Sequence, residues 1–152
     1  MKINKLNLGC GRDYREDWLN WDVSTEVKAD RHFDICRQVW PTPTASISEI
    51  YCSGVLEQIL ENKDLVHVMN ECHRVLIASG RLTVIVPSAR YRTAFQDPHD
   101  VRQFTEETFQ YFNQSSRYYQ LYGSIYGYLP WVLLDLTTNP RGIMTALLAK
   151  TQ

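Results

Sequence analysis

The sequence predicts an α/β fold built on a doubly wound, mostly parallel sheet that ends in an antiparallel C-terminal hairpin. First, strand-like and helix-like segments alternate along the chain, as they do where helices connect parallel strands. Second, the segment 81–86 (RLTVIV) is an apolar run stopped by Pro87, which is typical of a strand in a covered parallel sheet. Third, the turn 139–142 (NPRG) joins two strand-like segments into a hairpin.

The predicted strands follow from local composition and from the residues that interrupt them. The first covers 5–8 and runs into two glycines. The second covers 18–22, where aromatic and apolar residues favour a half-buried strand. The other predicted strands are 48–53, 81–86, 131–138 and 143–149. A short helix is expected after the first strand, so that helices would cover both faces of the sheet.

The clearest predicted helix lies between the third and fourth strands. Asn62 is its predicted N-cap, and Asp64 places a negative charge in the first turn, where the helix dipole favours it. Gly80 is the predicted stop signal. A second helix is expected to begin near Thr105, which suits an N-cap. In the first helix, four apolar residues at steps of four, three and four share one face: Leu65, Met69, Cys72 and Leu76.

Length and composition limit the classes of protein that the chain can be. It has 152 residues, with 16 Lys and Arg against 17 Asp and Glu, and 44% of it is hydrophobic. This composition excludes a disordered chain, and the length predicts one domain over 1–152. A net charge near zero does not indicate nucleic-acid binding. The longest apolar stretch, 129–136, is far shorter than the roughly 20 residues that span a bilayer, so no membrane partner is expected.

The cysteine pattern bears on the cellular compartment. The four cysteines form no C-x-x-C pair, and each lies in an apolar stretch or beside a glycine. This favours buried free thiols in a reducing cytoplasm over disulfides or a zinc site. No apolar region of a signal peptide follows the first residues. We therefore expect a cytoplasmic protein without a metal site, with free thiols at Cys10, Cys36, Cys52 and Cys72.

Two glycines directly after the first strand are the first candidate for a ligand site. Gly9 and Gly11 allow a sharp turn and let a ligand approach the backbone without meeting a Cβ. A dinucleotide fingerprint would place a third glycine at position 14, which is Tyr14, and the chain has no phosphate-binding Gly-Lys-Ser/Thr. The pair is therefore equally compatible with a plain structural turn.

Carboxylates follow the next strands, where the carboxyl ends of parallel strands form the usual ligand crevice. Asp22 ends the second strand, and its two oxygens match the vicinal hydroxyls of a ribose. Asp34 could accept a hydrogen bond from an exocyclic amine such as adenine N6, with Ile35 packing on the ring. The alternatives are a loop-capping role for Asp22 and a plain surface position for Asp34.

Taken together, these segments resemble the small class I S-adenosylmethionine (SAM)-dependent methyltransferases of the type 11 kind. The resemblance is carried in collinear order by LNLGCG at 6–11, WLNWD at 18–22 and ADRHFDI at 29–35, and then by three further segments: ISEIYCSGVLEQI at 47–59, ECHRVLIASGRLTVIVP at 71–87 and DPHDVRQFTEETF at 97–109. It implies a Rossmann-like, seven-stranded sheet whose last strand is antiparallel, and SAM as the cofactor.

The resemblance also implies a role for each matching residue. Gly9 and Gly11, with the backbone around Asn7 to Cys10, would line the methionine part of SAM. Asp22 would bind the ribose diol, and Asp34 and Ile35 would contact adenine. Ser53 and Gly54 would close the pocket near the methyl group. The predicted cofactor-binding residues are thus Asn7, Gly9, Cys10, Gly11, Asp22, Asp34, Ile35, Ser53 and Gly54.

Some positions depart from the family's pattern. Asn7 stands where an acidic residue is usual, Asp13 where a third glycine is frequent, and Gln58 where LEHI has its histidine. The usual D-P-x-H is DPHD at 97–100, with the histidine one place early. His99 is the candidate catalytic base, because its unperturbed pKa lies near neutrality, although a surface position is the alternative.

The acceptor of the methyl group is not specified by any motif. The aromatic-rich segment 118–131 could stack on a substrate, cover the sheet edge or hold a second copy in a homo-oligomer. Glu57, just beyond the expected methyl site, could act there or be a carboxylate at a helix start. Besides an active methyltransferase, the sequence leaves open a SAM- or S-adenosylhomocysteine (SAH)-binding scaffold without turnover, while the missing third glycine disfavours a nucleotide-dependent oxidoreductase.

Overall fold

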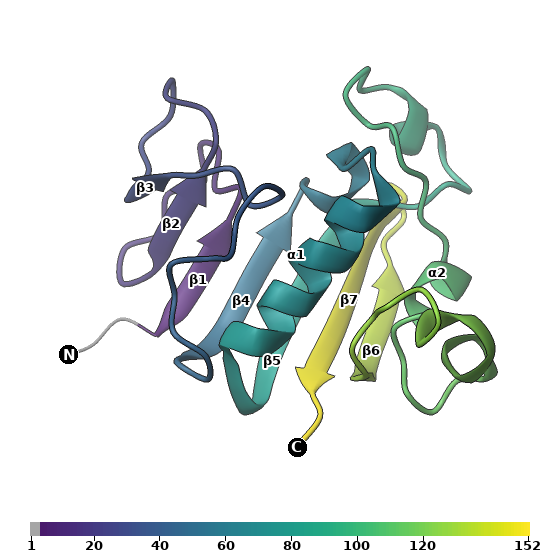
Figure 1. The fold of residues 1–152 in the computed structure, drawn as a ribbon. Helices are drawn as coiled ribbons and strands as arrows, with labels where there is room; N and C mark the ends of the chain where they lie inside the picture. The colour runs from purple at the N-terminus through teal and green to yellow at the C-terminus, as the bar shows by residue number, and fades with distance from the viewer. Residues whose placement is uncertain (1–3) are drawn as a thin grey trace.

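A seven-stranded sheet in the order β3-β2-β1-β4-β5-β7-β6 forms the centre of the molecule in a computed structural model that describes residues 4–152 (Figure 1). The strands from β3 to β5 pair in parallel, and β7 pairs antiparallel with β5 and β6. The order reverses between β1 and β4, so the predicted doubly wound sheet with a C-terminal hairpin is confirmed. The strands are β1 Lys5–Leu8, β2 Leu19–Asp22, β3 Arg31–His32, β4 Ile47–Ser53, β5 Leu76–Pro87, β6 Trp131–Thr138 and β7 Ile143–Lys150.

The long helix α1 begins close to the predicted position but ends earlier than Gly80 indicates. Glu61 is its N-cap residue in place of Asn62. Leu76 is already extended and pairs with Ile47, so Gly80 lies inside β5 rather than after a helix. The helices are η1 Leu56–Gln58, α1 Asn62–Val75, η2 Arg92–Phe95, α2 Glu106–Gln110 and the π-helical turn η3 Tyr119–Gly123.

The start of α2 agrees with the prediction. Thr105 is its N-cap residue, and the Thr105 N–H donates to the Thr108 hydroxyl at 3.0 Å. Within residues 4–152, no helix is long and apolar enough to cross a membrane.

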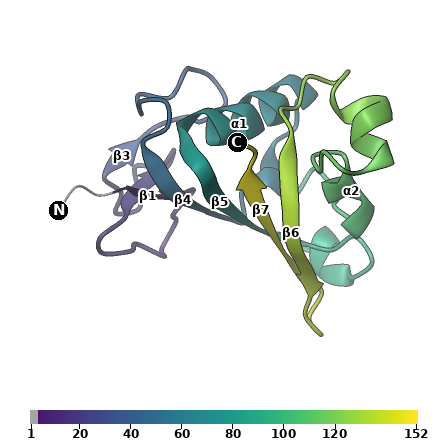
Figure 2. The same cartoon turned by 90° about the horizontal axis from the view of Figure 1, so that it is seen from below.

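One face of the sheet forms the core. Alternate strand residues point toward α1, which lies along this face in Figures 1 and 2. These residues are almost fully buried, and in α1 the apolar stripe of Leu65, Val68, Met69 and Cys72 is buried as well. The buried residues of the sheet on this side are Leu6, Leu8, Ile50, Cys52, Leu82, Val84, Val86, Met144, Ala146 and Leu148.

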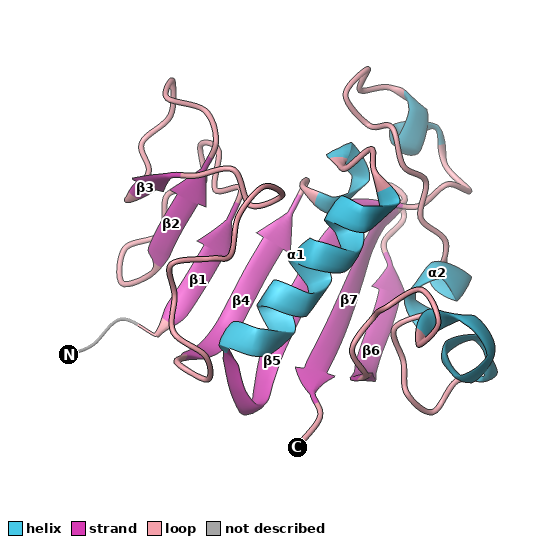
Figure 3. Cartoon of the chain, viewed as in Figure 1, coloured by secondary structure: helices cyan, strands magenta, loops and turns pink. Residues whose placement is uncertain are grey.

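The other face differs from the prediction, because no helix connects β1 to β2 or β2 to β3; Figure 3 draws both connections as loops. The loop 9–18 covers β1 and β2 and reaches Tyr51 of β4, where the Arg15 guanidinium lies 3.6 Å from the centre of the Tyr51 ring. It is held from below by Asn7, whose amide group donates to the Asp13 carbonyl at 2.8 Å and to Asn20 Oδ1 at 3.0 Å. Across β4, β5 and β7 this face carries half-buried side chains such as Tyr51, Thr83 and Leu147.

Candidate functional site

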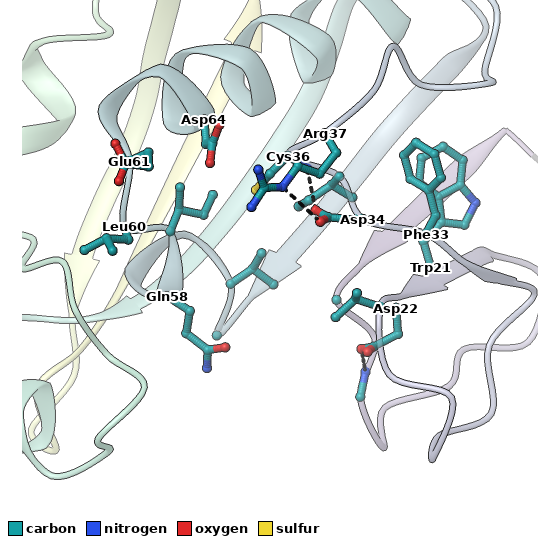
Figure 4. Close-up of a pocket in the computed structure, with 17 residues that line it drawn as sticks. Trp21, Asp22, Phe33, Asp34, Cys36, Arg37, Gln58, Leu60, Glu61 and Asp64 are labelled. Carbon is teal, nitrogen blue, oxygen red and sulfur yellow. Dashed lines mark hydrogen bonds and ion pairs between the residues drawn. The ribbon is translucent and has the colours of Figure 1, made fainter.

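A cavity of about 620 Å³ lies at the carboxyl ends of β1, β2 and β4, where the strand order reverses. Ligands of doubly wound sheets bind at this position, and the volume is within the usual range for small-molecule sites. Figure 4 shows Asp22, Asp34 and Arg37 on one side and Gln58, Leu60 and Glu61 on the other. The walls are therefore the loops after β1, β2 and β3 and the segment that leads into α1.

Gly9 and Gly11 form the turn that follows β1. Both have positive φ, at 60° and 51°, a conformation that favours glycine. A Cβ at Gly9 would lie 2.3 Å from Val55 Cγ2, so no side chain fits between this turn and the segment after β4. A Cβ at Gly11 would meet nothing within 4 Å, which leaves the backbone there open toward the cavity.

Asp22 stands at the end of β2 and is half-buried. Its Oδ2 accepts the Gly11 N–H, and its Oδ1 accepts the Ser24 N–H, both at 2.8 Å. A carboxylate offers about four acceptor positions, so these two bonds fix the side chain and leave further positions for a ligand. The arrangement can bind two neighbouring hydroxyl groups.

Asp34 and Ile35 lie on the cavity wall after β3. Asp34 Oδ1 accepts the Cys36 N–H at 3.0 Å, and Arg37 Nε lies 3.5 Å from Oδ2. The Asp34 side chain is about half exposed, so this ion pair is weakly held. The Ile35 carbonyl accepts the Trp40 indole N–H at 3.0 Å, which fixes the backbone of this wall to a buried anchor.

Trp40 is in turn tied to α1 by an ion pair beneath the wall. Its backbone N–H donates to Glu71 Oε2, and Arg74 donates to both carboxylate oxygens of Glu71, at 2.7 and 2.8 Å. Arg74 also donates to the carbonyls of Thr42 and Trp40. The connection from β3 to β4 is therefore held by charge-assisted hydrogen bonds, without a helix of its own.

Glu57 is a buried carboxyl in η1 at the carboxyl end of β4. Its carbonyl accepts the N–H groups of Val101 and Arg102, both at 2.9 Å, so the loop 97–102 is fastened here. Burial, with Asp100 and Asp97 nearby, raises the pKa of the Glu57 carboxyl to about 7. Carboxyl groups with such a shift are frequent at functional sites.

The structure brings six of the nine predicted cofactor residues to the cavity: Gly9, Gly11, Asp22, Asp34, Ile35 and Gly54. Asn7 and Cys10 are buried and do not line it. Ser53 is half-buried and likewise does not line it. The reason for Asn7 is the strand alternation, which points it to the opposite face from Leu6 and Leu8, where it holds the loop 9–18.

His99 does not lie in the cavity wall either. Its side chain is 83% exposed, and its Nδ1 lies 3.5 Å from Asp97 Oδ1. This is the surface position that the sequence left as the alternative. The catalytic role of His99 thus has no support from its position in the described structure.

Several lining residues were not predicted. They come mainly from 55–64, the segment that enters α1, and from Cys36 and Arg37. Burial raises the pKa of the Cys36 thiol to about 11, so it is not a nucleophile at neutral pH. In the sequence, Gln58 stood out only as a departure from LEHI. Its position shortly after the predicted strand 48–53 was the signal that could have assigned it to the site. The unpredicted lining residues are Trp21, Val23, Phe33, Cys36, Arg37, Val55, Gln58, Ile59, Leu60, Glu61 and Asp64.

Comparison with solved structures identifies the fold. A methyltransferase described as SAM-dependent from Clostridium acetobutylicum superposes with a TM-score of 0.66 at 14% identity, over 97% of this chain and 84% of that one. A chain of the complex between the Haloferax volcanii Trm112 methyltransferase activator and a methyltransferase gives 0.67 at 10%, over 97% and 82%. The Burkholderia thailandensis 1,6-didemethyltoxoflavin-N1-methyltransferase, solved with SAH, gives 0.64 at 16%, over 97% and 71%.

No protein-family model and no curated protein matches the chain by sequence. At the identities above, the structural likeness establishes the fold, which is that of the SAM-dependent methyltransferases, and confirms the resemblance that the sequence motifs predicted.

Proposed function

We propose that this protein binds SAM in the cavity at the carboxyl ends of β1, β2 and β4 and transfers its methyl group to an acceptor. The observation that carries the proposal is Asp22, a carboxylate fixed by the Gly11 and Ser24 N–H groups and lining the same cavity as the glycine turn. Its remaining acceptor positions suit the ribose diol. The fold of the structural neighbours supports the same ligand.

The chemistry of the cavity fits the parts of SAM. The open backbone at Gly11 suits the methionine part, which brings its own charged groups and needs close approach. Ile35 and the half-buried Phe33 offer apolar surface to adenine, and Asp34 offers an acceptor to its amine. Gly54, directly after β4, would lie at the methyl end, and Ser53, the last residue of β4, would support it from outside the cavity lining. In this proposal Asn7 and Cys10 contribute only through the turn that they support.

Bound SAM would supply an electrophilic methyl group on a sulfonium. The chain's contribution would then be mainly to hold donor and acceptor in line and to exclude water. The hydrogen bonds that fasten the loop 97–102 to the Glu57 carbonyl support a role for this loop near the proposed methyl end. A base would be needed only for an acceptor that loses a proton during transfer.

A SAM- or SAH-binding scaffold without turnover is the second candidate. The observation that favours it is the exposed position of His99, which leaves the predicted base outside the cavity. Formation of SAH from SAM with a panel of small-molecule, peptide and RNA acceptors separates the two. Turnover that survives His99→Ala supports the methyltransferase with another base or none, whereas binding without turnover on any acceptor supports the scaffold.

Calorimetry with SAM and SAH tests the proposed ligand. We expect both to bind, and Asp22→Ala to weaken each by roughly 1.5–3 kcal/mol, the range for a hydrogen bond to a charged group. Asp13→Ala is the matched control, because Asp13 is a carboxylate in the loop 9–18 that pairs with Arg15 on the surface and does not line the cavity. Failure of both ligands to bind, or unchanged affinity in Asp22→Ala, contradicts the proposal.

Two further parts of the proposal concern the cellular compartment and the oligomeric state. The free thiols, three of them buried, suit a cytoplasmic protein, where cysteines stay reduced. Exposed apolar residues in 118–131 suit a homo-oligomer: Ile125 is 78% and Tyr126 55% exposed. Light scattering on Ile125→Asp tests this contact, because a charge there would shift a dimer to monomer and leave a monomer unchanged.

A further inference from the structure

The Glu57 side chain is buried without a partner for one of its oxygens. The residue is 4% exposed, and Oε2 is a buried atom with no hydrogen bond. Oε1 lies 3.8 Å from the position that a Cβ would take at Gly54, which lines the cavity. A buried carboxyl in this state is costly unless a positive charge or a donor joins it. Among the described residues, no donor bonds to Oε2.

The groups around Glu57 do not compensate its charge. Asp97 and Asp100 act on it from the loop 97–102, and Cys52 faces it from β4. Both aspartates raise the pKa of Glu57, and burial keeps the Cys52 thiol protonated. His99 lies near Asp97 at the surface, and its charge bears on Asp100 of the same loop. The Glu57 carboxyl is therefore buried among acidic neighbours.

We propose that Glu57 provides the negative charge that favours a cationic sulfur centre beside Gly54, so that the cavity prefers SAM over SAH. This inference rests on the proposed function, because it concerns the methyl end of the same ligand. SAM carries a positive sulfonium, and SAH carries a neutral thioether. A buried charge is screened much less than an exposed one, so direct contact between Glu57 and the ligand is not required.

The preference follows the protonation state of Glu57. When the carboxyl is neutral, it affects the affinities for SAM and SAH about equally. When it is ionised, it raises the affinity for SAM and leaves that for SAH unchanged. Because the pKa of Glu57 is about 7, this change falls between pH 6 and pH 8. SAM and SAH share the adenosine part, so the ratio of their dissociation constants cancels the titration of that part, and the comparison of wild type with Glu57→Gln cancels the titration of the ligands' own amino groups.

The test is calorimetry with SAM and with SAH at pH 6, 7 and 8. In the wild type, we expect the ratio of the SAH to the SAM dissociation constant to rise about five- to tenfold from pH 6 to pH 8, as expected for one ionising charge. In Glu57→Gln, we expect the ratio to stay constant across this range. His99→Gln is the matched control, because it removes an ionisable side chain beside Asp97 on the loop 97–102 and leaves Glu57 in place, so it should keep the rise.

Three results would overturn the inference. The first is a ratio that does not change with pH in the wild type. This result needs no variant, so it holds whether or not Glu57→Gln folds. A rise that persists in Glu57→Gln or disappears in His99→Gln assigns the effect to another group. Binding of neither ligand overturns the proposed function and this inference with it, whereas binding of both with a constant ratio overturns this inference alone.

Discussion

The two faces of the sheet are built differently. The face toward α1 is apolar and nearly closed to solvent, from Leu6 in β1 to Leu148 in β7. The opposite face is covered over β1 and β2 by the loop 9–18, and across β4, β5 and β7 it presents half-buried residues such as Thr83 and Leu147. Sheets of this class commonly have helices on both faces. Here, in residues 4–152, loops on the second face are sufficient to position the cleft.

The comparison shows where the cleft draws its rigidity. Its walls are residues just beyond the strand ends, and they are fixed by side chain-to-backbone hydrogen bonds such as Asp22 to Gly11 and Trp40 to Ile35. Helix packing on the second face is not needed for these contacts. The face toward α1 therefore stabilises the domain, while the loops at the rim set the geometry of the proposed cofactor site.

The largest expected effect is on the free energy of unfolding, when leucine is replaced by alanine at two neighbouring positions that point to opposite faces of the sheet. Leu148→Ala removes a side chain that is 0% exposed and should lower the free energy of unfolding by about 3 kcal/mol. Leu147→Ala removes the same atoms from the half-buried face and should cost under about 1 kcal/mol. Urea denaturation measures both. Equal losses would show that the second face is as well packed as the first.

The second prediction compares a buried with a half-buried carboxyl. Glu57 has a raised pKa of about 7 in the folded state, so its protonated form is favoured there. The contribution of Glu57 to folding stability is therefore greatest below its unfolded pKa of about 4.5, is lost as pH rises to about 7, and changes little above that. Glu57→Gln should thus stabilise the protein by about 2 kcal/mol at pH 8 and by little at pH 5.

Glu49→Gln is the control for Glu57→Gln, because Glu49 lies on the opposite face in an exposed ion pair with Lys5. It should change stability little at either pH. Thermal melts at pH 5 and pH 8 measure both variants. A Glu57→Gln variant that is less stable than wild type at pH 8 would show that the carboxylate has a stabilising partner in the folded protein.

The sequence predicted the elements that have a local signal. β1 at 5–8, the hairpin turn at 139–142 and the start of α2 after Thr105 all agree with the structure. β3 is two exposed residues, Arg31 and His32, and no hydrophobic pattern marks such a strand. A short helix was expected after β1, where the structure has the loop 9–18. No sequence pattern indicates this loop, since it is ordered by buried Asn7 and Asn20 rather than by an apolar stripe.

The site was predictable only as far as it follows strand ends. Asp22, Asp34 and the glycine turn come directly after strands, which is why sequence reasoning found them. The wall from Val55 to Asp64 depends on how closely this segment approaches Gly9, and such a distance has no signal in the sequence. Asn7 was assigned to the cofactor because it lies in the glycine motif, although alternation within β1 turns it away from the cavity.

The third prediction concerns the ion pair under the wall after β3. Burial alone would raise the pKa of Glu71. Hydrogen bonds from Arg74 and Trp40 outweigh burial and lower this pKa below its usual value. Glu71→Gln should cost about 1.5 kcal/mol at pH 7. Because a lowered pKa contributes stability that is lost as pH falls, the difference from wild type should shrink below about pH 4.5. Urea titrations at pH 7 and pH 4 measure this difference, with Glu61→Gln, at the exposed N-cap position of the same helix, as control.

The smallest expected effect comes from breaking an ion pair on the second face of the sheet. Lys5 Nζ lies 2.9 Å from Glu49 Oε2, but the two side chains are 44% and 39% exposed, against 27% and 10% for Arg74 and Glu71. Water and salt screen the exposed pair, so Lys5→Gln should cost under about 0.5 kcal/mol and less at high ionic strength. Denaturation at low and high salt measures this cost. A loss as large as that of Glu71→Gln would mean that the second face is covered in solution, because only a desolvated pair has such a value.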